Sequence, residues 1–294
     1  MSSHVQHTRA ALEGLMDQYL ESMVAHEPAR LPLHKKVKNT ENTIQLPVGE
    51  GLWATASDLP TYRLYVCDPQ AGQVGLYGLM KENGFPILIA SRLKTEKGQI
   101  TEIENIVVRQ QGERPMPTEK LVKPREAFLA DLKPAERVSR AEMIRISDLY
   151  FEALVRDDGN IIPLWDGCNR IENGMQTTNN PNLFPRDPKR PPMPLDCRGQ
   201  INAKAFAYIT SIKPRRYTVI DEERGLTFGT FMFHHTGTIK SVEVPGIGTV
   251  EMIPIARRPF TVVVSELFKI QSGKIREIEA IMTSLPYGAK SGWD

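Results

Sequence analysis

Residues 17–24 read DQYLESMV and residues 148–155 read DLYFEALV, two stretches separated by 131 positions. Both begin with Asp, end with Val and place apolar residues at helical spacing, and a repeat at a fixed offset indicates a duplicated structural unit. The same offset relates four further pairs: Leu33 with Leu164, Glu41 with Glu172, Asn42 with Asn173, and Gln45 with Gln176. We therefore expect one fold to be present twice.

The offset between the two copies grows further along the chain. Two later matches have offsets of 153 and 175: VCDPQAG (66–72) with VIDEERG (219–225), and KGQITEIEN (97–105) with SGKIREIEA (272–280). Insertions in the second copy account for the growth, namely the proline-rich stretch 179–199 and the stretch 235–258, which predicts a long hairpin. For the prolines within 181–194 three interpretations stay open: a lid, a contact with another subunit, or a plain exposed loop.

Each copy predicts helices first and strands last. Apolar residues from Leu12 to Met23 recur at helical spacing, and Pro134 suits the first turn of a helix over 134–155. The second copy predicts another helix over about 199–212. Its strands are expected at 215–221, 226–235, 258–270 and 274–282. This order predicts an α+β fold.

The chain length suits two domains. A chain of 294 residues accommodates two compact units of about 100–150 residues each. The polar, proline-bearing stretch that ends near residue 134 predicts a connection between them. We place a first domain at 1–115, a linker at 116–136 and a second domain at 137–294.

Composition narrows the class of protein. The net charge is +2, from 37 Lys and Arg against 35 Asp and Glu, and lacks the concentrated positive field of nucleic-acid-binding proteins. The N-terminal residues have no secretion-signal pattern, and apolar runs such as FTVVVSELF (260–268) are far shorter than a membrane span of about 20 residues. Cys67, Cys168 and Cys197 form no CxxC motif and are expected to be buried thiols of a reducing compartment. We expect a cytoplasmic protein with neither nucleic-acid nor membrane partners.

Motifs for bound cofactors and metals are missing from the sequence. It contains no Walker A string, no glycine-rich dinucleotide turn opening a helix, no HExxH and no GxSxG. His234 and His235 are adjacent on a predicted strand, so their side chains point to opposite faces and cannot chelate one ion. We expect neither a cofactor nor a metal site.

The order of helices and strands, together with DGCNRIENG (166–174), resembles the nuclear-transport-factor-2-like (SnoaL-like) superfamily. The resemblance implies two tandem cone-shaped domains, each with helices packed on a strongly curved antiparallel sheet. It also implies a small, largely apolar ligand in the cone. Enzymes of this superfamily are usually cofactor-free dehydratases, isomerases, cyclases, epoxide hydrolases or C–C lyases, and other members only bind ligands or partner proteins.

Departures between the copies point to candidate catalytic residues. Asp166 replaces Lys35 and Arg170 replaces Asn39. In an extended segment Arg170 and Glu172 share a face, so they either form a structural ion pair or point together into the interior. In the functional interpretation Arg170 holds an oxygen of the ligand while Glu172 or Asp166 transfers a proton, because burial raises the pKa of a carboxyl group.

Further candidates come from the second copy. One of His234 and His235 is expected to face inward as a general base, the alternative being a surface histidine at a strand end. Tyr208 is a candidate hydrogen-bond donor. Tyr150 is expected to pack in the core with its hydroxyl in contact with water, and otherwise to contact the substrate. Asn173 is expected to hold a turn, as its repeat in both copies indicates, and otherwise to contact the ligand. The apolar lining is expected from four aromatic residues: Phe206, Phe231, Phe233 and Trp165.

These observations predict small-molecule chemistry in the second copy, on a hydrophobic or aromatic substrate. The preferred reaction is that of a cofactor-independent lyase, which dehydrates a hydroxylated aromatic or polycyclic molecule or cleaves a C–C bond in it by a retro-aldol or deformylation-type step. One alternative is an isomerase or cyclase of a polyketide, terpenoid or steroid; another is a non-catalytic binding or assembly protein. The first copy is expected to be a degenerate half that completes a pseudo-dimer, and a homo-oligomer stays open.

Overall fold

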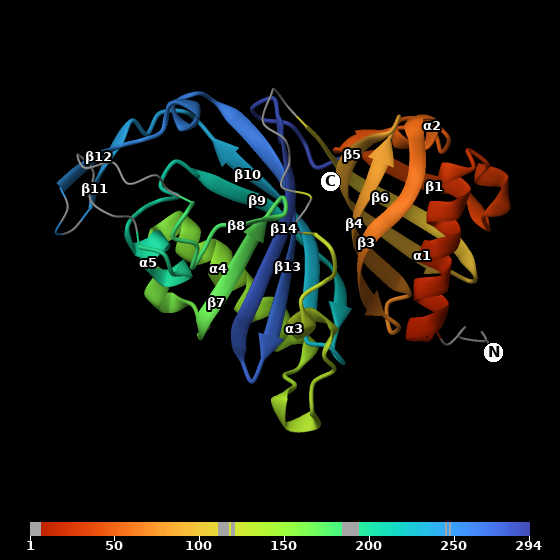
Figure 1. Ribbon diagram of the computed structural model, residues 1–294, viewed down its shortest axis with the longest axis horizontal. Coiled ribbons are helices and arrows are strands. Elements are labelled where there is room, and N and C mark those ends of the chain that lie inside the picture. Colours follow the sequence, from red (N-terminus) through yellow and green to blue (C-terminus); the bar gives the residue numbers. More distant parts are fainter. Residues whose placement is uncertain (1–6, 111–117, 119–120, 184–193, 245, 247) are drawn as a thin grey trace.

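The computed structural model describes residues 7–110, 118, 121–183, 194–244, 246 and 248–294. This part of the chain is an α+β structure with two six-stranded sheets (Figure 1). No helix within it is long and apolar enough to cross a membrane. Most of the proline-rich stretch predicted as a lid, a subunit contact or a loop lies outside the described residues.

The two sheets have the same order of strands, as expected for a duplicated unit. The first has the order β2-β1-β6-β5-β4-β3, with β1 (Leu33–Glu41), β2 (Ile44–Gln45), β3 (Ala56–Asp68), β4 (Gln73–Glu82), β5 (Phe85–Glu96) and β6 (Gln99–Arg109). The second has the order β8-β7-β14-β13-β10-β9, with β7 (Leu164–Glu172), β8 (Met175–Gln176), β9 (Ser211–Asp221), β10 (Leu226–His235), β13 (Phe260–Gln271) and β14 (Lys274–Leu285).

The sheets are mixed rather than purely antiparallel, which corrects the prediction from sequence. β1 pairs in parallel with β6, and β7 pairs in parallel with β14, while the other neighbouring strands are antiparallel. The first strand of each half lies beside the last one and runs in the same direction, a pairing that apolar alternation does not encode. The expected hairpin is present as a separate two-stranded sheet of β11 (Ser241–Val244) and β12 (Gly248–Glu251).

One long helix opens each half. In α1 (Arg9–Val24) the Thr8 hydroxyl accepts from the Ala11 N–H at 3.2 Å, and in α4 (Arg140–Arg156) the Ser139 hydroxyl accepts from Glu142 N–H at 3.2 Å. These bonds satisfy N–H groups that have no partner within the helix. The shorter helical segments are α2 (Leu52–Thr55), α3 (Glu126–Leu129) and the 3-10 turns Pro28–Arg30, Pro134–Glu136, Gly159–Ile161 and Pro254–Arg257.

The helix predicted over 199–212 is shorter and begins earlier. It is α5 (Cys197–Asn202), and the Asp196 side chain accepts from the Gly199 N–H at its start. Lys204 has a φ of 57°, a left-handed conformation that ends a helix, and a series of turns then leads to β9. The side chains of residues 203–208 therefore approach the interior from a loop.

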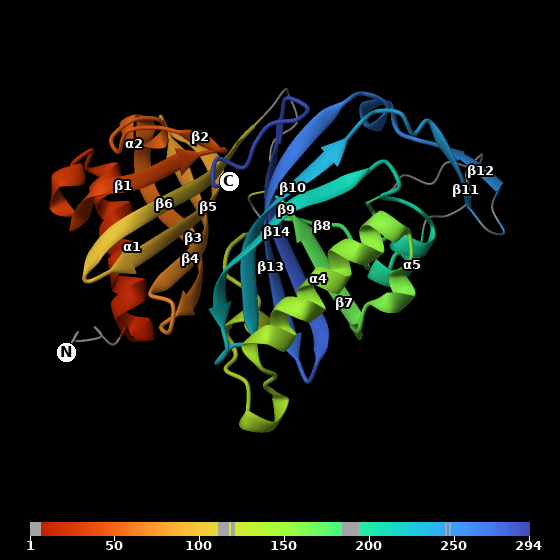
Figure 2. The same ribbon diagram turned by 180° about the vertical axis from the view of Figure 1, so that it is seen from behind.

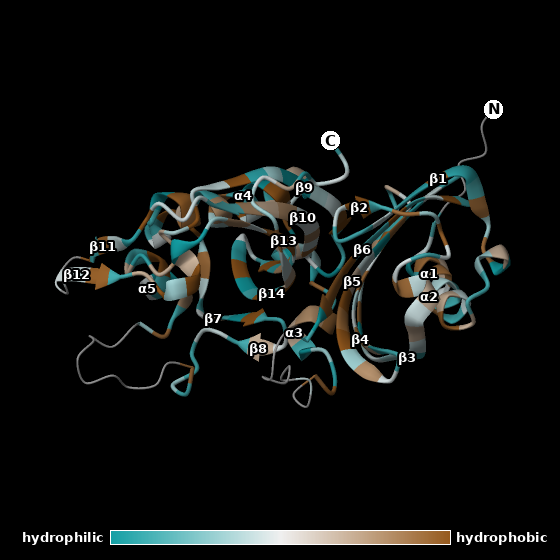
Figure 3. Cartoon of the chain, turned by 90° about the horizontal axis from the view of Figure 1, so that it is seen from above, coloured by the Kyte–Doolittle hydropathy of each residue, from teal (hydrophilic) through white to brown (hydrophobic). Residues whose placement is uncertain are grey.

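The layers follow the order helix, sheet, sheet, helix. α1 packs on one face of the first sheet through a cluster that includes Met16 and Leu20, and α4 packs on one face of the second sheet through a cluster that includes Ile146 and Phe151 (Figure 2). The other faces of the two sheets meet in a third apolar cluster (Figure 3). Its members include Leu64, Val66, Val108, Phe228, Met232 and Leu267.

Reciprocal ion pairs join the two halves at the starts of their helices. Arg9 of α1 donates to both carboxylate oxygens of Asp221, at 2.9 and 2.8 Å. Arg140 of α4, 131 positions after Arg9, pairs with Asp68, 153 positions before Asp221. Contacts that occur twice with the partners exchanged are the mark of a twofold interface. The halves thus pack as the subunits of a symmetric dimer do, within one chain.

Candidate active site

The interior of the second half, between the second sheet and its helices, contains a buried charged cluster. Arg170 on β7 is 2 % exposed, and its guanidinium carbon lies 4.6 Å from the centre of the Phe206 ring. Its Nε lies 2.8 Å from Glu172 Oε1, and Nη2 donates to Gln200 Oε1 at 2.6 Å. A buried guanidinium requires such partners, because an uncompensated charge in an apolar interior is costly. The pairing of Arg170 with Glu172 anticipated from their spacing is present, and it lies in the interior.

The turn after β7 holds Arg170 in place. Asn173 and Gly174 have φ angles of 46° and 80°, which reverse the chain so that the following residues run back along β7. Thr177 Oγ1 then accepts from Arg170 Nε at 3.1 Å, and Thr178 Oγ1 accepts from the Arg170 backbone N–H at 2.7 Å. The orientation of the guanidinium therefore depends on local hydrogen bonds as well as on Glu172.

A second carboxyl group, that of Glu266 on β13, faces the same interior. Val264 and Phe268, two residues before and after it on the same face of the strand, belong to the apolar cluster beneath α4. Burial raises the pKa of Glu266 well above its ordinary value, and the negative charge of Glu172 raises it further, while Arg170 opposes this. The uncharged form of Glu266 is favoured, and among the described residues its Oε2 has no hydrogen-bond partner.

Tyr150 belongs to the same interior. Tyr150 comes from α4 and is 2 % exposed, with its ring packed edge-on against Phe268 at 5.3 Å between ring centres. Its hydroxyl interacts with Glu266 and lowers the pKa of that carboxyl group, and it also interacts with Arg170. Burial raises the pKa of Tyr150 well above its ordinary value, so it keeps its proton and acts as a donor. The ring packs in the core as predicted, whereas the prediction of a solvated hydroxyl differs from a side chain that is almost fully buried.

His235 and Tyr208 form a second, aromatic part of the interior. The His235 ring stacks on Tyr208 at 5.1 Å and on Phe260 at 4.1 Å between ring centres. Burial lowers the pKa of His235 to about 4, so the imidazole is neutral at physiological pH. Burial raises the pKa of Tyr208 to about 12, with the charge of Glu172 adding to the effect. Tyr208 thus lies within the electrostatic reach of the charged cluster.

His234 faces away from this interior. Its Nε2 lies 2.9 Å from the Lys213 carbonyl oxygen and its Nδ1 lies 3.1 Å from Thr261 Oγ1. Met232, two residues earlier on the same face of β10, belongs to the cluster between the sheets. The expectation that one histidine of the pair faces inward holds for His235, and the structure does not bring His234 to the cluster.

Asp166 and Trp165 are also outside the cluster. Both are exposed on the first part of β7, and Trp165 is 38 % exposed with the Arg276 guanidinium 5.7 Å from its ring centre. The register of β7 against β14 shifts between the pair Leu164–Ile275 and the pair Asn169–Glu277. Gly167, within this irregular segment, has a φ of 75°. The bulge turns these side chains to solvent, a feature that residue alternation alone cannot predict.

Phe231 and Phe233 contribute to the apolar core of the second half. Phe231 is fully buried and packs on Phe151 at 4.3 Å, and Phe233 packs edge-on against the same ring at 5.8 Å. Half-buried Phe206, over the guanidinium of Arg170, is the aromatic residue placed directly at the charged cluster.

Asn173 serves the fold in the way that its repeat indicated. Its Nδ2 donates to the Met282 carbonyl at 3.0 Å and its Oδ1 accepts from the Met282 N–H at 2.9 Å. Asn42 makes the same two bonds with Val107, at 3.0 and 2.8 Å. Because both atoms of the carboxamide bind the backbone, Asn173 is not placed to bind a ligand, contrary to that part of the prediction.

Sequence reasoning missed Glu266 and Gln200. The signal for Glu266 was present, since it is the one acidic residue in the apolar stretch 260–268. At two residues from Val264, it points to the same face of the strand. An acid at a core-facing position of a buried strand is unusual and marks a functional candidate. Gln200 had no such signal, because its role depends on where α5 packs.

The cysteines and histidines form no metal centre within the described part of the chain. All three cysteines are free and buried, as expected. No group of three or more His, Cys, Asp or Glu in the described part of the chain is arranged to hold a metal ion.

Comparisons with known proteins give a family and little else. The family model described as "Domain of unknown function (DUF8021)" matches residues 136–282, which is half of the chain. No curated protein matches the chain. Among solved structures it is similar to one described as "Crystal Structure of Putative Isomerase from Bacillus subtilis", with 7% sequence identity, a TM-score of 0.31, and coverage of 49% of this chain and 87% of that one. A likeness of this size carries no argument about fold or reaction.

Proposed function

The chain belongs, through residues 136–282, to the family described as a domain of unknown function (DUF8021), and we propose that its second half is a cofactor-independent acid–base enzyme. The observation that carries this proposal is a buried guanidinium paired with one glutamate at 2.8 Å, in an apolar interior that also contains a second, buried glutamate and a buried phenol. These are Glu172, Glu266, Tyr150 and Arg170. Ionisable groups gathered in an otherwise apolar interior are the usual signature of a catalytic site.

The proposed first step removes a proton from a carbon atom next to a carbonyl group. Glu172 accepts this proton, and the carbonyl oxygen of the substrate becomes negative. Tyr150 and uncharged Glu266 donate hydrogen bonds to that oxygen, an arrangement of phenol and neutral carboxylic acid that stabilises the enolate in ketosteroid isomerase. Arg170 orients Glu172 and offsets the negative charge that develops.

We assign the base to Glu172 rather than to His235. The His235 ring is stacked on Tyr208 at 5.1 Å and on Phe260 at 4.1 Å between ring centres, an arrangement suited to packing against a ligand. The Glu172 side chain is 29 % exposed, so one side of the ion pair is open to an entering molecule. His235 and Tyr208 then form a wall for an apolar or aromatic substrate.

Dehydration and isomerisation share this first step and differ in the destination of the proton, whereas retro-aldol cleavage begins with a proton taken from oxygen and reaches the same enolate by breaking the Cα–Cβ bond. Delivery to a leaving hydroxyl gives dehydration, and abstraction of a proton from a β-hydroxyl group gives retro-aldol cleavage. Delivery to another carbon gives isomerisation. We propose dehydration or retro-aldol cleavage of a hydroxylated aromatic or polycyclic molecule first, and isomerisation as the second candidate.

Two further features belong to this proposal. Each half is a nuclear-transport-factor-2-like cone, whose concave sheet face in the second half holds the cluster. The first domain ends near residue 115 and the second begins near 137. The protein is cytoplasmic, and its first half has no catalytic role. A non-catalytic binding protein would instead be expected to have an apolar interior, and the buried charge of Arg170 and the buried carboxyl group of Glu266 oppose that alternative.

The test is exchange of α-hydrogen for deuterium, followed by NMR in D₂O. The probes are 1-tetralone, 2-tetralone and a set of cyclic β-hydroxy ketones, which also report elimination. Wild-type protein is expected to accelerate exchange for at least one probe, and Glu172→Gln is expected to lower the rate by about 10²–10⁴-fold, the usual contribution of a general base.

The matched control is Glu41→Gln in the first half, at the position that corresponds to Glu172. Glu41 accepts from the Leu52 N–H at 2.6 Å and pairs with Arg109 at 2.9 Å, so it has a structural role only. The control is expected to keep the wild-type exchange rate. Equal rates in wild type and Glu172→Gln for every accelerated probe would remove Glu172 from the mechanism.

A further inference from the structure

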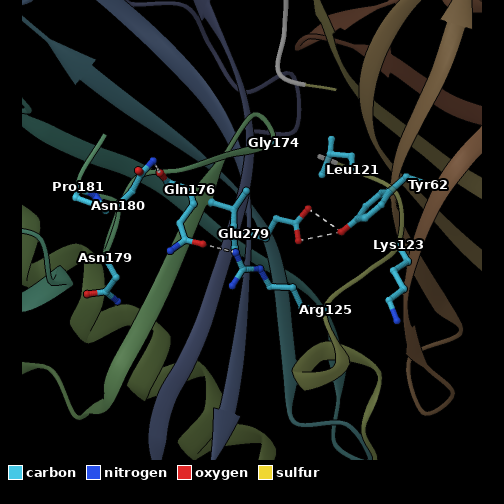
Figure 4. A pocket seen from close by; sticks show the side chains of 11 residues that line it. Tyr62, Leu121, Lys123, Arg125, Gly174, Gln176, Asn179, Asn180, Pro181 and Glu279 are labelled. Atoms are coloured by element: carbon cyan, nitrogen blue, oxygen red, sulfur yellow. Dashed lines mark hydrogen bonds between the residues drawn. The ribbon is translucent and has the colours of Figure 1, made fainter. Parts of the chain in front are cut away.

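A cavity of about 290 Å³ lies at the junction of the two halves (Figure 4). Tyr62 from β3, Ile171 from β7 and Glu279 from β14 line it, together with Lys123 and Arg125 from the segment between the sheets. Its volume is at the lower end of the range of about 300–1,000 Å³ typical of small-molecule sites. The Ile171 side chain alternates along β7 with those of the charged cluster, so this cavity is separate from the candidate active site.

Polar groups converge on the cavity from both halves. The Tyr62 hydroxyl lies 3.0 and 3.1 Å from the two oxygens of Glu279, and the two side chains point toward one another in Figure 4. Arg125 Nη2 donates to Gln176 Oε1 at 2.5 Å, and Nη1 lies 3.5 Å from Glu277. Burial raises the pKa of Glu279 to about 7. Among the lining residues the two cations therefore outweigh the one acidic group at neutral pH.

The corresponding place in the first half is filled by the C-terminal residues. Ile171 and Gly174 correspond to Thr40 and Thr43 at the offset of 131. Trp293 Nε1 donates to Thr40 Oγ1 at 3.0 Å, and Gly292 packs against the Thr43 carbonyl group. Figure 1 shows the C terminus beside the first sheet. The protein thus places an aromatic ring at the pseudo-equivalent position.

Cations surround this ring. The Lys38 ammonium lies 4.4 Å from its centre, and the guanidinium carbons of Arg92 and Arg216 lie 4.9 and 5.0 Å from it. Cations within about 6 Å of an indole centre are attracted to its π system. Both arginines also bind Glu104, the counterpart of the cavity's carboxyl group at the offset of 175. An aromatic ring beside a cation and a glutamate is therefore a stable arrangement on this scaffold.

We propose that the junction cavity binds a small aromatic carboxylate, with its ring in the place that Trp293 takes in the first half and its carboxylate paired with Arg125 and Lys123. Arg125 and Lys123 supply the positive charge for an anion, each lying 3.5 Å from a glutamate outside the lining, Glu277 and Glu126. Ile171 with Leu121 gives the ring an apolar contact. A guanidinium is suited to a carboxylate, because it donates two parallel hydrogen bonds. This site is independent of the proposed enzymatic function.

Isothermal titration of the full chain with benzoate and with indole-3-carboxylate tests the proposal. At least one of them is expected to bind, and Arg125→Met is expected to weaken it about tenfold or more, the usual value of a hydrogen bond to a charged group. Leu121→Trp, which fills the cavity without changing its charge, is expected to abolish binding. Arg145→Met, which removes a surface guanidinium from α4, is the matched control and leaves binding unchanged.

The pH dependence of binding sharpens the test, as do neutral indole, which has the ring without the carboxylate, and acetate, which has the carboxylate without the ring. Binding is expected to be tighter at pH 6 than at pH 8, because Glu279, which faces Tyr62, Arg125 and Glu277, loses its negative charge on protonation. Glu279→Gln is expected to remove that dependence. Absence of binding by both carboxylates, equal affinity of neutral indole, equal affinity of acetate, or full binding by Arg125→Met and Leu121→Trp would each overturn the proposal.

Discussion

The interiors of the two halves contain different polar groups at corresponding positions. In the first half the Tyr19 hydroxyl donates to Asn105 Oδ1 at 3.1 Å, and the Ser91 hydroxyl donates to the same oxygen at 2.7 Å. The Trp53 ring packs edge-on against Tyr19 at 5.4 Å and is fully buried. This interior is filled by an indole ring and by neutral groups that bind one another.

The second half keeps the tyrosine and replaces three other polar residues. At the corresponding positions it has Tyr150 for Tyr19, Arg170 for Asn39, Glu266 for Ser91 and Ala280 for Asn105. The tyrosine is retained, but its hydroxyl now faces a guanidinium and a carboxyl group. The same fold therefore tolerates either a neutral interior or a charged one, and a charged one costs stability. Such a cost is expected where the side chains serve function.

The largest difference between the halves is expected from removing the hydroxyl that both retain. Tyr150→Phe is expected to lower the rate of α-hydrogen exchange by about 10²–10³-fold, the usual loss for one oxyanion donor. Tyr19→Phe is expected to leave that rate within about twofold of wild type, because its partner Asn105 has no part in the chemistry. Exchange in D₂O measures both, and equal losses in the two variants would contradict the difference in function between the halves.

A smaller effect is expected in the pH dependence of stability. Folding raises the pKa of Glu266, so its contribution is most favourable at pH values below the unfolded pKa of about 4.3 and is lost as the pH rises toward the folded pKa. Glu266→Gln is therefore expected to gain stability relative to wild type between pH 5 and pH 8, as measured by urea unfolding.

Glu104 between the sheets gives the opposite control. The charges of Arg92 and Arg216 outweigh burial and lower its pKa, so its contribution is present above the unfolded pKa and is lost as the pH falls. Glu104→Gln is expected to lose stability relative to wild type at pH 7, with the loss shrinking toward acidic pH. The same direction of change in both variants would show that the two carboxyl groups do not differ in environment as described.

The smallest effects are expected for the two histidines. His234→Ala removes hydrogen bonds to Thr261 and Lys213 and is expected to cost about 1 kcal/mol of unfolding free energy without changing turnover. His235→Ala is expected to raise KM several-fold with little change in kcat, since a neutral ring that stacks on Tyr208 contributes binding rather than proton transfer. A kcat loss above about 100-fold in His235→Ala would restore this residue as the general base.

Sequence alone predicted much of the architecture for identifiable reasons. The three offsets of 131, 153 and 175 are also the differences between the starts of β1 and β7, β4 and β10, and β5 and β13. Strand alternation placed His234 and His235 on opposite faces, and the repeated Asn42 and Asn173 indicated a shared turn. These features depend on local chain geometry, which the sequence pattern reports directly.

The remaining features depend on long-range packing. The parallel pairing of β7 with β14, and the bulge that turns Asp166 to solvent, arise from how distant strands meet. Gln200 reaches Arg170 only because α5 packs against β7, and the junction cavity forms only where the halves meet. Glu266 could have been found from its apolar surroundings, and it is the residue on which the functional account now depends most.

The protonation state of Glu266 tests the central claim most directly. Difference infrared spectroscopy of wild type against Glu266→Gln, at pH 7 and without any substrate, reports whether this side chain is a carboxylic acid or a carboxylate. The account predicts the carbonyl band of a protonated carboxyl group in wild type, absent from the variant, because burial and Glu172 raise its pKa. A carboxylate signal for Glu266 at pH 7, persisting down to pH 5, would contradict it.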